Sequence, residues 1–327
     1  MTVLQEVYQY LRQSFPEISP EHLTPLSADA SDRKYFRLQL QHRSLIATYS
    51  ENKEENKDFI YIASLLAGHE IPAPKVLQHS NDMRIYLQSD AGSQALLSKI
   101  SSSTRADNLV TLQQVITQLI AMQWNVHSSI DYEQLHHHRS FDAPLIYRDL
   151  FYFKHYFLDL KELAYNEAAL LRDFEQLVHN VQNIRHRAFM YRDFQSRNIH
   201  FHENQYIFID FQGGMYGPVL YDLVSLIWQA KAGISAQDKE QLFQHYLTET
   251  SKFLSTKLSE SEWRIDYNHL TLLRLLQVMG AYGKLGLLHN KKHFLESIEM
   301  GIANLKEILP YTFMQEFPAI RQIIKQL

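Results

Sequence analysis

The stretch from Met190 to Gly214, MYRDFQSRNIHFHENQYIFIDFQGG, constrains the fold of this chain more than any other part of it. Asp193 is followed by four residues and then Asn198, two short apolar runs flank a polar turn, and Asp210 follows the second run. Apolar runs of this length around a turn predict a β-hairpin. Such a hairpin would bring Asp193, Asn198 and Asp210 to one of its ends.

The three polar side chains are of the types that phosphoryl transfer needs. Asp193 can orient a substrate hydroxyl and accept its proton. Asn198 and Asp210 offer oxygen ligands to the magnesium of a nucleotide. The alternative is an exposed hairpin with incidental acids.

A second copy of the first three residues serves as an internal comparison. Tyr147-Arg148-Asp149 repeats the Tyr-Arg-Asp that ends at Asp193, but the residue five beyond Asp149 is Lys154, and no hairpin pattern follows. We interpret this copy as a polar turn on a helical segment. Only the second copy has the surrounding chemistry of a site.

Length and composition exclude several classes of protein. The 327 residues permit two domains or one bilobal fold, and 45% hydrophobic with 21% charged residues is typical of a globular chain. The net charge of −4, without a long basic run, argues against nucleic acid as a partner. No apolar run approaches the roughly 18 residues of a membrane helix, and no secretory signal is visible. The absence of cysteine excludes disulfides and thiolate metal sites and fits a cytoplasmic location.

Residues 1–90 predict a small lobe that contains β-strands. We expect helices over 3–15 and 51–66, strands ending near 38 and over 44–49, 75–78 and 84–88, and a hinge at 89–92. The loop of small residues before the first strand of this set can turn its N–H groups toward phosphate oxygens. It contains no glycine, so a simple hairpin is the alternative at this point.

Residues 91–327 predict a mainly helical lobe, with helices over 108–126, 221–228, 236–253, 267–289, 292–309 and near 314–324. The aromatic segment 141–157 predicts core, or else a wall for a sugar ring, where Arg148 could meet an acidic group. Three consecutive histidines, 136–138, are splayed and predict a solvated loop rather than a metal site.

Three stretches give the chain a resemblance to a known family. They are Ala28–Leu38 (ADASDRKYFRL), Asp193–Asn198 with Ile209–Gln212, and Gly217–Leu226 (GPVLYDLVSL). The chain resembles the aminoglycoside phosphotransferase family of kinase-like small-molecule kinases. Within that family it is most similar to the branch of bacterial N-acetylmuramate/N-acetylglucosamine kinases. The resemblance implies an α+β, bilobal, protein-kinase-like fold with a β-containing N-lobe and a helical C-lobe.

The resemblance also implies a role for individual residues. Asp193 becomes the catalytic base, Asn198 and Asp210 become the magnesium ligands, and Asp222 becomes a structural brace for the catalytic loop. Ser31 becomes a contact of the phosphate loop. Beside these implied roles, we expect Asp32 and Arg33 to bind the nucleotide and Arg148 and Gln212 to contact the substrate.

The chain departs from the kinase pattern at one position that matters for the nucleotide. The strand 45–49 has no lysine where kinases hold the α- and β-phosphates, and the similar sugar-kinase branch also lacks it. Arg33 or Lys34 could supply the missing positive charge. Glu54 or Glu55 could take the place of the acidic residue on the kinase αC helix.

From these features we expect an enzyme that uses ATP and Mg²⁺ to phosphorylate a small molecule, by resemblance at the anomeric hydroxyl of an N-acetyl amino sugar in cell-wall recycling. One alternative is a kinase of another hydroxyl compound, such as an aminoglycoside, choline or homoserine. The other is a non-catalytic nucleotide-binding regulator. Neither a membrane nor nucleic acid is expected as a partner, and the sequence does not determine an oligomeric state.

Overall fold

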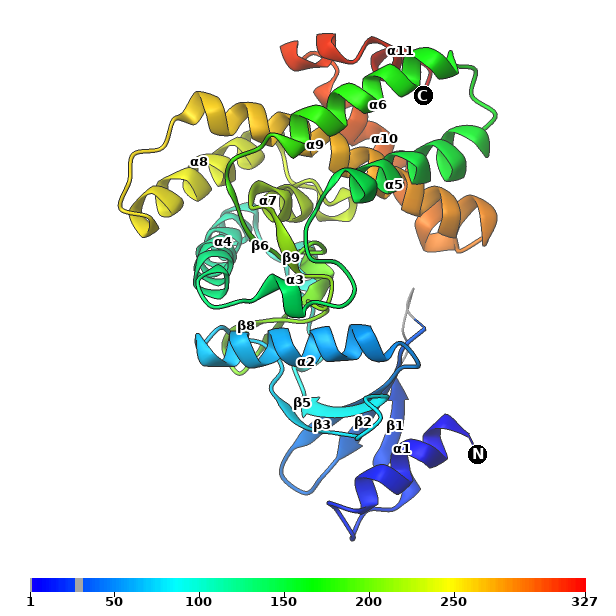
Figure 1. Ribbon diagram of the computed structural model, residues 1–327, viewed down its shortest axis with the longest axis vertical. Helices are drawn as coiled ribbons and strands as arrows, with labels where there is room; N and C mark the ends of the chain where they lie inside the picture. The colour runs from blue at the N-terminus through cyan, green and yellow to red at the C-terminus, as the bar shows by residue number, and fades with distance from the viewer. Residues whose placement is uncertain (1, 27–31) are drawn as a thin grey trace. The chain divides into compact units, whose positions relative to one another are not determined.

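The computed structural model describes residues 2–26 and 32–327, which form two compact units. The first unit contains Met1–Leu96, Asn125–Arg139 and Arg197–Gly214, and the remaining segments form the second (Figure 1). The contacts thus group two segments with the N-terminal unit that lie beyond the expected boundary at residue 90. The assignment of 1–90 and 91–327 to two functional lobes stays a prediction. Among the described helices, none is long and apolar enough to cross a membrane.

The first unit is built on an antiparallel five-stranded sheet with the order β1-β2-β3-β5-β4. The strands are β1 (Leu23–Leu26), β2 (Lys34–Gln39), β3 (Ser44–Tyr49), β4 (Val76–His79) and β5 (Ile85–Ser89). Helix α1 (Val3–Arg12) covers one face and helix α2 (Lys53–Gly68) covers the other (Figure 1). The strands and the two helices expected for this part of the chain are confirmed.

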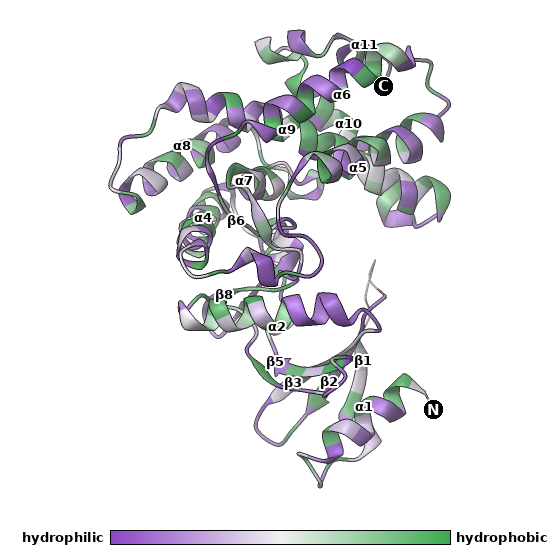
Figure 2. Cartoon of the chain, in the orientation of Figure 1, coloured by the Kyte–Doolittle hydropathy of each residue, from purple (hydrophilic) through white to green (hydrophobic). Residues whose placement is uncertain are grey.

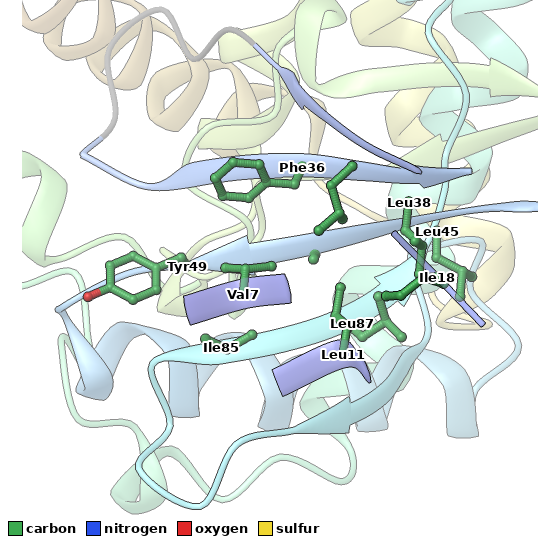
Figure 3. Close-up of a cluster of buried hydrophobic side chains, with 11 residues drawn as sticks. Val7, Leu11, Ile18, Phe36, Leu38, Leu45, Tyr49, Ile85 and Leu87 are labelled. Atoms are coloured by element: carbon green, nitrogen blue, oxygen red, sulfur yellow. The ribbon is translucent and has the colours of Figure 1, made fainter. Parts of the chain in front are cut away.

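The face under α1 carries a compact apolar core, shown in Figure 3. Val7 and Leu11 lie one helical turn apart and are fully buried. They pack against inward-facing residues of β2, β3 and β5, including Phe36, Leu45 and Leu87. Burial of this face fixes the register of the strands, because a shift by one residue would turn these side chains to the other face.

The opposite face is closed by α2, which is hydrophilic in its first turns (Figure 2). Asn52 caps the helix by accepting a hydrogen bond from the Glu55 N–H at 3.2 Å. Further along, the Phe59 ring stacks on Tyr86 of β5 at 4.8 Å and on Phe211 at 4.4 Å. The helix therefore fixes the segment around Phe211 within the first unit.

The predicted hairpin is present as β7 (Ile199–His202) and β8 (Gln205–Phe208). Its two turn residues, Glu203 and Asn204, have φ angles of 48° and 65°, as a tight two-residue hairpin turn requires. The Phe208 N–H donates to the Pro72 carbonyl oxygen at 2.9 Å. Such contacts attach the hairpin to the first unit.

The second unit is mainly helical. Its elements include α5 (Ala143–Phe153), α6 (Glu167–Gln182), α7 (Leu220–Ile227), α8 (Ala236–Phe253), α9 (Glu260–Tyr282), α10 (Lys292–Ile308), α11 (Pro318–Gln326), most of α3 (Leu96–Ser102) and α4 (Arg105–His127), and the strand pair β6 (Arg187–Met190) and β9 (Met215–Pro218). Helix α9 is the central element and packs on α5, α6, α7 and α10. Such a helix is apolar around much of its circumference.

Shorter helical turns complete the chain. They are η1 (Pro20–His22), η2 (Tyr132–Gln134), η3 (Lys154–Asp159), η4 (Ser196–Asn198), η5 (Ala230–Ala232), η6 (Gly283–Leu288) and η7 (Thr312–Glu316), of which η3 and η6 are π-helical. The sequence analysis did not predict α3, α6 or the β6–β9 pair. In β6–β9, the strands that pair are separated by the whole hairpin, so no local pattern reveals their pairing.

Most of the aromatic segment 141–157 belongs to the core, since Phe141, Phe153 and Phe157 are fully buried. The interpretation of Tyr147-Arg148-Asp149 as an ordinary polar turn is wrong for its last residue. Asp149 lies on α5 and is only 4% exposed. A buried carboxylate needs a partner, and its partner belongs to the loop of Asp193.

Candidate active site

The loop that carries Asp193 is hydrogen-bonded to the fully buried carboxylate of Asp222, near the start of α7. The Tyr191 and Arg192 N–H groups donate to its two oxygens at 2.8 and 2.9 Å, and the Gln123 side-chain amide donates at 2.9 Å. Burial raises the pKa of Asp222 to about 7, although these three hydrogen bonds act to lower it. Asp222 thus fixes the backbone on the N-terminal side of Asp193.

Arg192 is the ion-pair partner of the buried Asp149 carboxylate. The Arg192 guanidinium donates to an Asp149 oxygen at 2.5 Å and to the Tyr221 hydroxyl at 2.9 Å, and it lies 4.7 Å from the centre of the Phe141 ring. Its backbone has a φ of 82°, an uncommon conformation for a residue with a side chain. The buried ion pair keeps the loop in this conformation, because separating the pair would leave a buried charge unpaired.

Ser196 anchors the other end of the same loop. Its backbone N–H and its hydroxyl both donate to the Gln229 side-chain oxygen, at 2.9 and 2.6 Å. Asp222 lies in the first turn of α7 and Gln229 lies two residues beyond its end, so the loop from Tyr191 to Ser196 is attached to the core at both ends. Asp193 lies between the two attachments.

Asp193 itself is 48% exposed at its side chain, and it contacts a buried cation. The Arg274 guanidinium on α9 donates to Asp193 Oδ1 at 3.3 Å, to the Tyr221 hydroxyl at 3.3 Å and to the Gln277 side-chain oxygen at 2.8 Å. Arg274 is 3% exposed. A positive charge at this distance favours the ionised form of a carboxylate, which is the form a general base needs.

Sequence reasoning missed Arg274, Asp149 and Gln229. Arg274 had a usable signal, because it stands alone in the apolar run Leu272-Leu-Arg-Leu-Leu276 of a helix that is otherwise core. A lone arginine in such a run indicates a buried charge that requires a partner. Nothing in the sequence identifies that partner as Asp193.

Asn198 and Asp210 lie together in the first unit, as the hairpin predicted. The Asn198 amide donates to Asp210 Oδ2 at 3.3 Å, and the Gln212 amide donates to Asp210 Oδ1 at 2.7 Å. Asp210 has a φ of 69°, so its backbone is held in the left-handed region without the freedom of glycine. Gln212, an expected substrate contact, thus lies next to Asp210, an expected metal ligand.

The donor set of this pair fits a magnesium ion. Carboxylate and amide oxygens are hard ligands, and Mg²⁺ is usually held by one or two carboxylates together with substrate phosphates. Over residues 2–26 and 32–327, no group of three or more His, Cys, Asp or Glu side chains is placed to hold a metal alone. Asn198 and Asp210 are the residues whose oxygens could contribute to such a site.

Arg33 is a buried cation in the first unit and is one of the two residues expected to supply the charge of the missing lysine. Arg33 is 3% exposed; it lies 3.4 Å from the Glu55 carboxylate on α2 and donates to the Tyr86 hydroxyl at 3.4 Å. Lys34 is exposed. Burial by itself would lower the pKa of Arg33, but the neighbouring Tyr86 and Glu55 raise it above its usual value. The geometry therefore favours Arg33 over Lys34, and Glu55 as the acidic partner.

Two of the remaining expected site residues, Asp32 and Arg148, are exposed or half-exposed. Ser31 lies outside the described residues, and Asp32 is exposed. Arg148 has a 51% exposed side chain that lies 3.8 Å from Asp149 Oδ1 in the second unit. In the first unit, the histidines of segment 136–138 lie in a loop whose backbone donates to the buried Asp58 carboxylate.

The fold and these residues define a protein-kinase-like phosphotransferase architecture, and the comparison with known families agrees. Residues 22–256, more than half of the chain, match the model of the phosphotransferase enzyme family that includes the aminoglycoside phosphotransferases. The chain belongs to this family. The predicted α+β fold with a β-containing N-lobe and a mainly helical C-lobe is confirmed.

Among curated relatives, the chain is 29% identical over 221 residues to the N-acetylmuramate/N-acetylglucosamine kinase of Pseudomonas aeruginosa, covering 66% of this chain and 62% of the relative. It is 27% identical to the kinase of the same name from Pseudomonas putida, covering 65% of this chain and 61% of the relative. The chain thus spans about three fifths of the length of these relatives.

Solved structures share the fold at low identity. An amicoumacin kinase in complex with AMP-PNP, Ca²⁺ and its ligand has a TM-score of 0.61 at 15% identity, covering 89% of this chain and 92% of that one. An ethanolamine kinase of Plasmodium vivax has a TM-score of 0.64 at 12% identity, covering 95% and 88%. A choline kinase of Cryptosporidium parvum has a TM-score of 0.62 at 10% identity, covering 98% and 99%. At these identities the likeness concerns the fold alone.

Proposed function

We propose that this protein transfers the γ-phosphoryl group of ATP, with Mg²⁺, to the hydroxyl of a small molecule, most specifically the anomeric hydroxyl of an N-acetyl amino sugar. The observation that carries the proposal is the contact of half-exposed Asp193 with buried Arg274, on a loop anchored at both ends. Asn198, which pairs with Asp210, follows Asp193 after four intervening residues. A loop with a purely structural role would not need a half-exposed carboxylate beside a buried arginine.

The reaction divides among residues with defined tasks. The Asp193 carboxylate accepts a hydrogen bond from the attacking hydroxyl, directs its oxygen at the γ-phosphorus and takes the proton as the new P–O bond forms. The bond between the γ-phosphorus and the β–γ bridging oxygen breaks, and ADP leaves with the electron pair. Asn198 and Asp210 would hold the magnesium ion, which when bound neutralises phosphate charge.

The first unit supplies the nucleotide contacts in this proposal. Arg33, oriented by Glu55, takes the role of the lysine that kinases place on the third strand. We assign Asp32, and Ser31 outside the described residues, to further phosphate contacts on the family resemblance alone. In the second unit, Asp222 acts as the brace of the catalytic loop. We assign Gln212 and Arg148 to the substrate side.

The substrate class rests on the curated relatives, whose names specify N-acetylmuramate and N-acetylglucosamine. A sugar 1-phosphate is the product that this substrate class implies. The proposal includes a cytoplasmic location, because ATP is the phosphoryl donor. Kinases of choline, homoserine or aminoglycosides, and a regulator that only binds nucleotide, are the rival functions.

The decisive experiment measures ADP release from ATP and Mg²⁺ with N-acetylmuramate, N-acetylglucosamine, choline, homoserine and kanamycin. We expect turnover on the N-acetyl sugars and a loss of about a thousandfold in Asp193→Ala. Nucleotide binding, followed by a thermal shift, should survive this substitution. Asp107→Ala removes an exposed carboxylate on α4 and should retain activity. Turnover only on another acceptor would show that the substrate is not an N-acetyl sugar. An active Asp193→Ala variant would refute the assignment of Asp193 as the base.

A further inference from the structure

The second unit contains a cavity of about 520 Å³ that the proposed reaction does not use. It lies between α8, α9 and the segment that follows α10, and its aromatic lining comes from Trp228, Tyr267, Tyr311 and Phe313. Small-molecule sites commonly have volumes of roughly 300–1,000 Å³ and a mainly aromatic lining with a few polar groups. The cavity therefore has the size and the walls of a ligand site.

The charged groups of the cavity are paired with one another. The Lys239 ammonium lies 2.7 Å from Glu307 Oε2 and 3.7 Å from the centre of the Trp228 ring. Arg264 donates to Glu240 at 2.8 Å. A ligand with a net charge would lose its hydration here without gaining an unpaired opposite charge. The paired charges favour a neutral ligand.

Polar groups without a protein partner indicate what that ligand must offer. Glu307 Oε1 is buried and lacks a hydrogen-bond partner in the described part of the chain, so it calls for a donor such as a hydroxyl. The ammonium of Lys239, only 4% exposed, has three donors, of which one reaches Glu307. The Asn268 amide lines the cavity and makes no hydrogen bond to the residues that the structure describes. Adjacent hydroxyls on one ring could bond to both Glu307 and Lys239, and aromatic faces suit the C–H surface of such a ring.

We infer that this cavity binds a neutral sugar at a site separate from the acceptor on which Asp193 acts. On α9, Tyr267 in the cavity precedes Arg274, the partner of Asp193, by two helical turns, which is a rise of about 10 Å. Along α7, Tyr221 contacts Arg274, whereas Trp228 donates to the Tyr267 hydroxyl at 2.8 Å. The cavity lining and the Arg274–Asp193 contact are therefore separated along both helices.

The test measures N-acetylglucosamine binding to the full chain by calorimetry, without nucleotide, so that its outcome does not depend on turnover. Asn268→Leu replaces the amide by an apolar group of the same branching, and Thr312→Val removes a second hydrogen-bonding group of the cavity lining. Because N-acetylglucosamine is also the proposed acceptor, two binding events are expected, and each substitution should weaken one of them at least tenfold and leave the other unchanged. Ile265→Ala changes a 56% exposed side chain on α9 outside the lining and should leave binding unchanged. Melting curves check that each variant folds.

The same variants separate this site from the acceptor site. With turnover established, the acceptor KM should remain within about twofold of the wild-type value in Asn268→Leu and Thr312→Val. Sugar binding that neither substitution weakens would overturn the inference. A rise in acceptor KM that matches the loss of binding would also overturn it, because the cavity would then be the acceptor site itself. Without turnover on any acceptor, the proposed function fails, and the calorimetric comparison still decides this inference.

Discussion

At the scale of single residues, Arg274 is the group on which the proposed base depends most directly. It is buried on a core helix, yet its guanidinium reaches the half-exposed Asp193. Tyr221 and Gln277 fix its position through two further hydrogen bonds. Arg274 is therefore a positioning residue: it favours an ionised Asp193 and limits the rotamers of that side chain.

Replacing Arg274 with glutamine should lower kcat by about a hundredfold with little change in KM, because the substrate still binds while the base is misplaced. The acidic limb of the pH–rate profile should move to higher pH, since a nearby positive charge no longer favours the carboxylate. Arg274→Lys should restore part of kcat and return the acidic limb toward its wild-type position.

Steady-state kinetics over a range of pH checks this prediction. A structural role alone would lower the amount of folded enzyme without moving the acidic limb. An unchanged profile in Arg274→Gln would therefore contradict the positioning role.

At the scale of secondary-structure elements, α9, which carries Arg274, and its π-helical extension η6 pass close to α5 and η3. Gly283, the first residue of η6, allows the approach: a Cβ built there would lie 1.9 Å from the Tyr156 carbonyl oxygen. One helical turn earlier, a Cβ on Gly280 would lie 2.7 Å from the Phe153 nitrogen. Because these neighbours are backbone atoms, they cannot yield by changing rotamer.

Gly283→Ala should destabilise the protein by about 3 kcal/mol or more, since the helices must move apart to accept a methyl group. Urea unfolding measures the change. Gly68→Ala is the matched control: Gly68 ends α2, and a Cβ there meets no atom within 4 Å. That substitution should be neutral or stabilise by up to about 1 kcal/mol. Equal stability of Gly283→Ala and the wild type would contradict the packing argument.

At the scale of the whole molecule, Asp222 makes the stability of the folded chain depend on pH. Burial raises its pKa to about 7, whereas an aspartate in the unfolded chain has a pKa near 3.9. Between these values the folded state holds a proton that the unfolded state releases. The contribution of Asp222 to stability is therefore fully present below about pH 4 and is lost as the pH rises through about 7.

Asp222→Asn removes this dependence, as well as one acceptor for the loop N–H groups. The wild type should exceed the variant in free energy of unfolding by about 2 to 3 kcal/mol more at pH 5 than at pH 8. Urea titrations at the two pH values measure this difference. If the wild type and Asp222→Asn differed in free energy of unfolding by the same amount at pH 5 and pH 8, Asp222 would stay ionised in the folded protein.

Several local elements could be predicted from short stretches of the sequence, although helices α3 and α6 were not. The hairpin β7–β8 follows from two short apolar runs around Glu203 and Asn204, whose backbone accepts a tight turn. Helix α8 has the predicted bounds, Ala236–Phe253, because its periodic apolar positions begin after the capping residue Ser235. These features depend on neighbours within a few residues, so a local pattern contains the information.

The tertiary structure alone decided which distant charges meet. Asp193 and Arg274 are separated by 81 positions, and Asp149 and Arg192 by 43. Periodicity reveals that Arg274 lies on a buried helix, but its partner follows only from how α9 packs on α5 and α7. Burial then enforces the pairing, because an unpaired charge in the core costs far more than an exposed one.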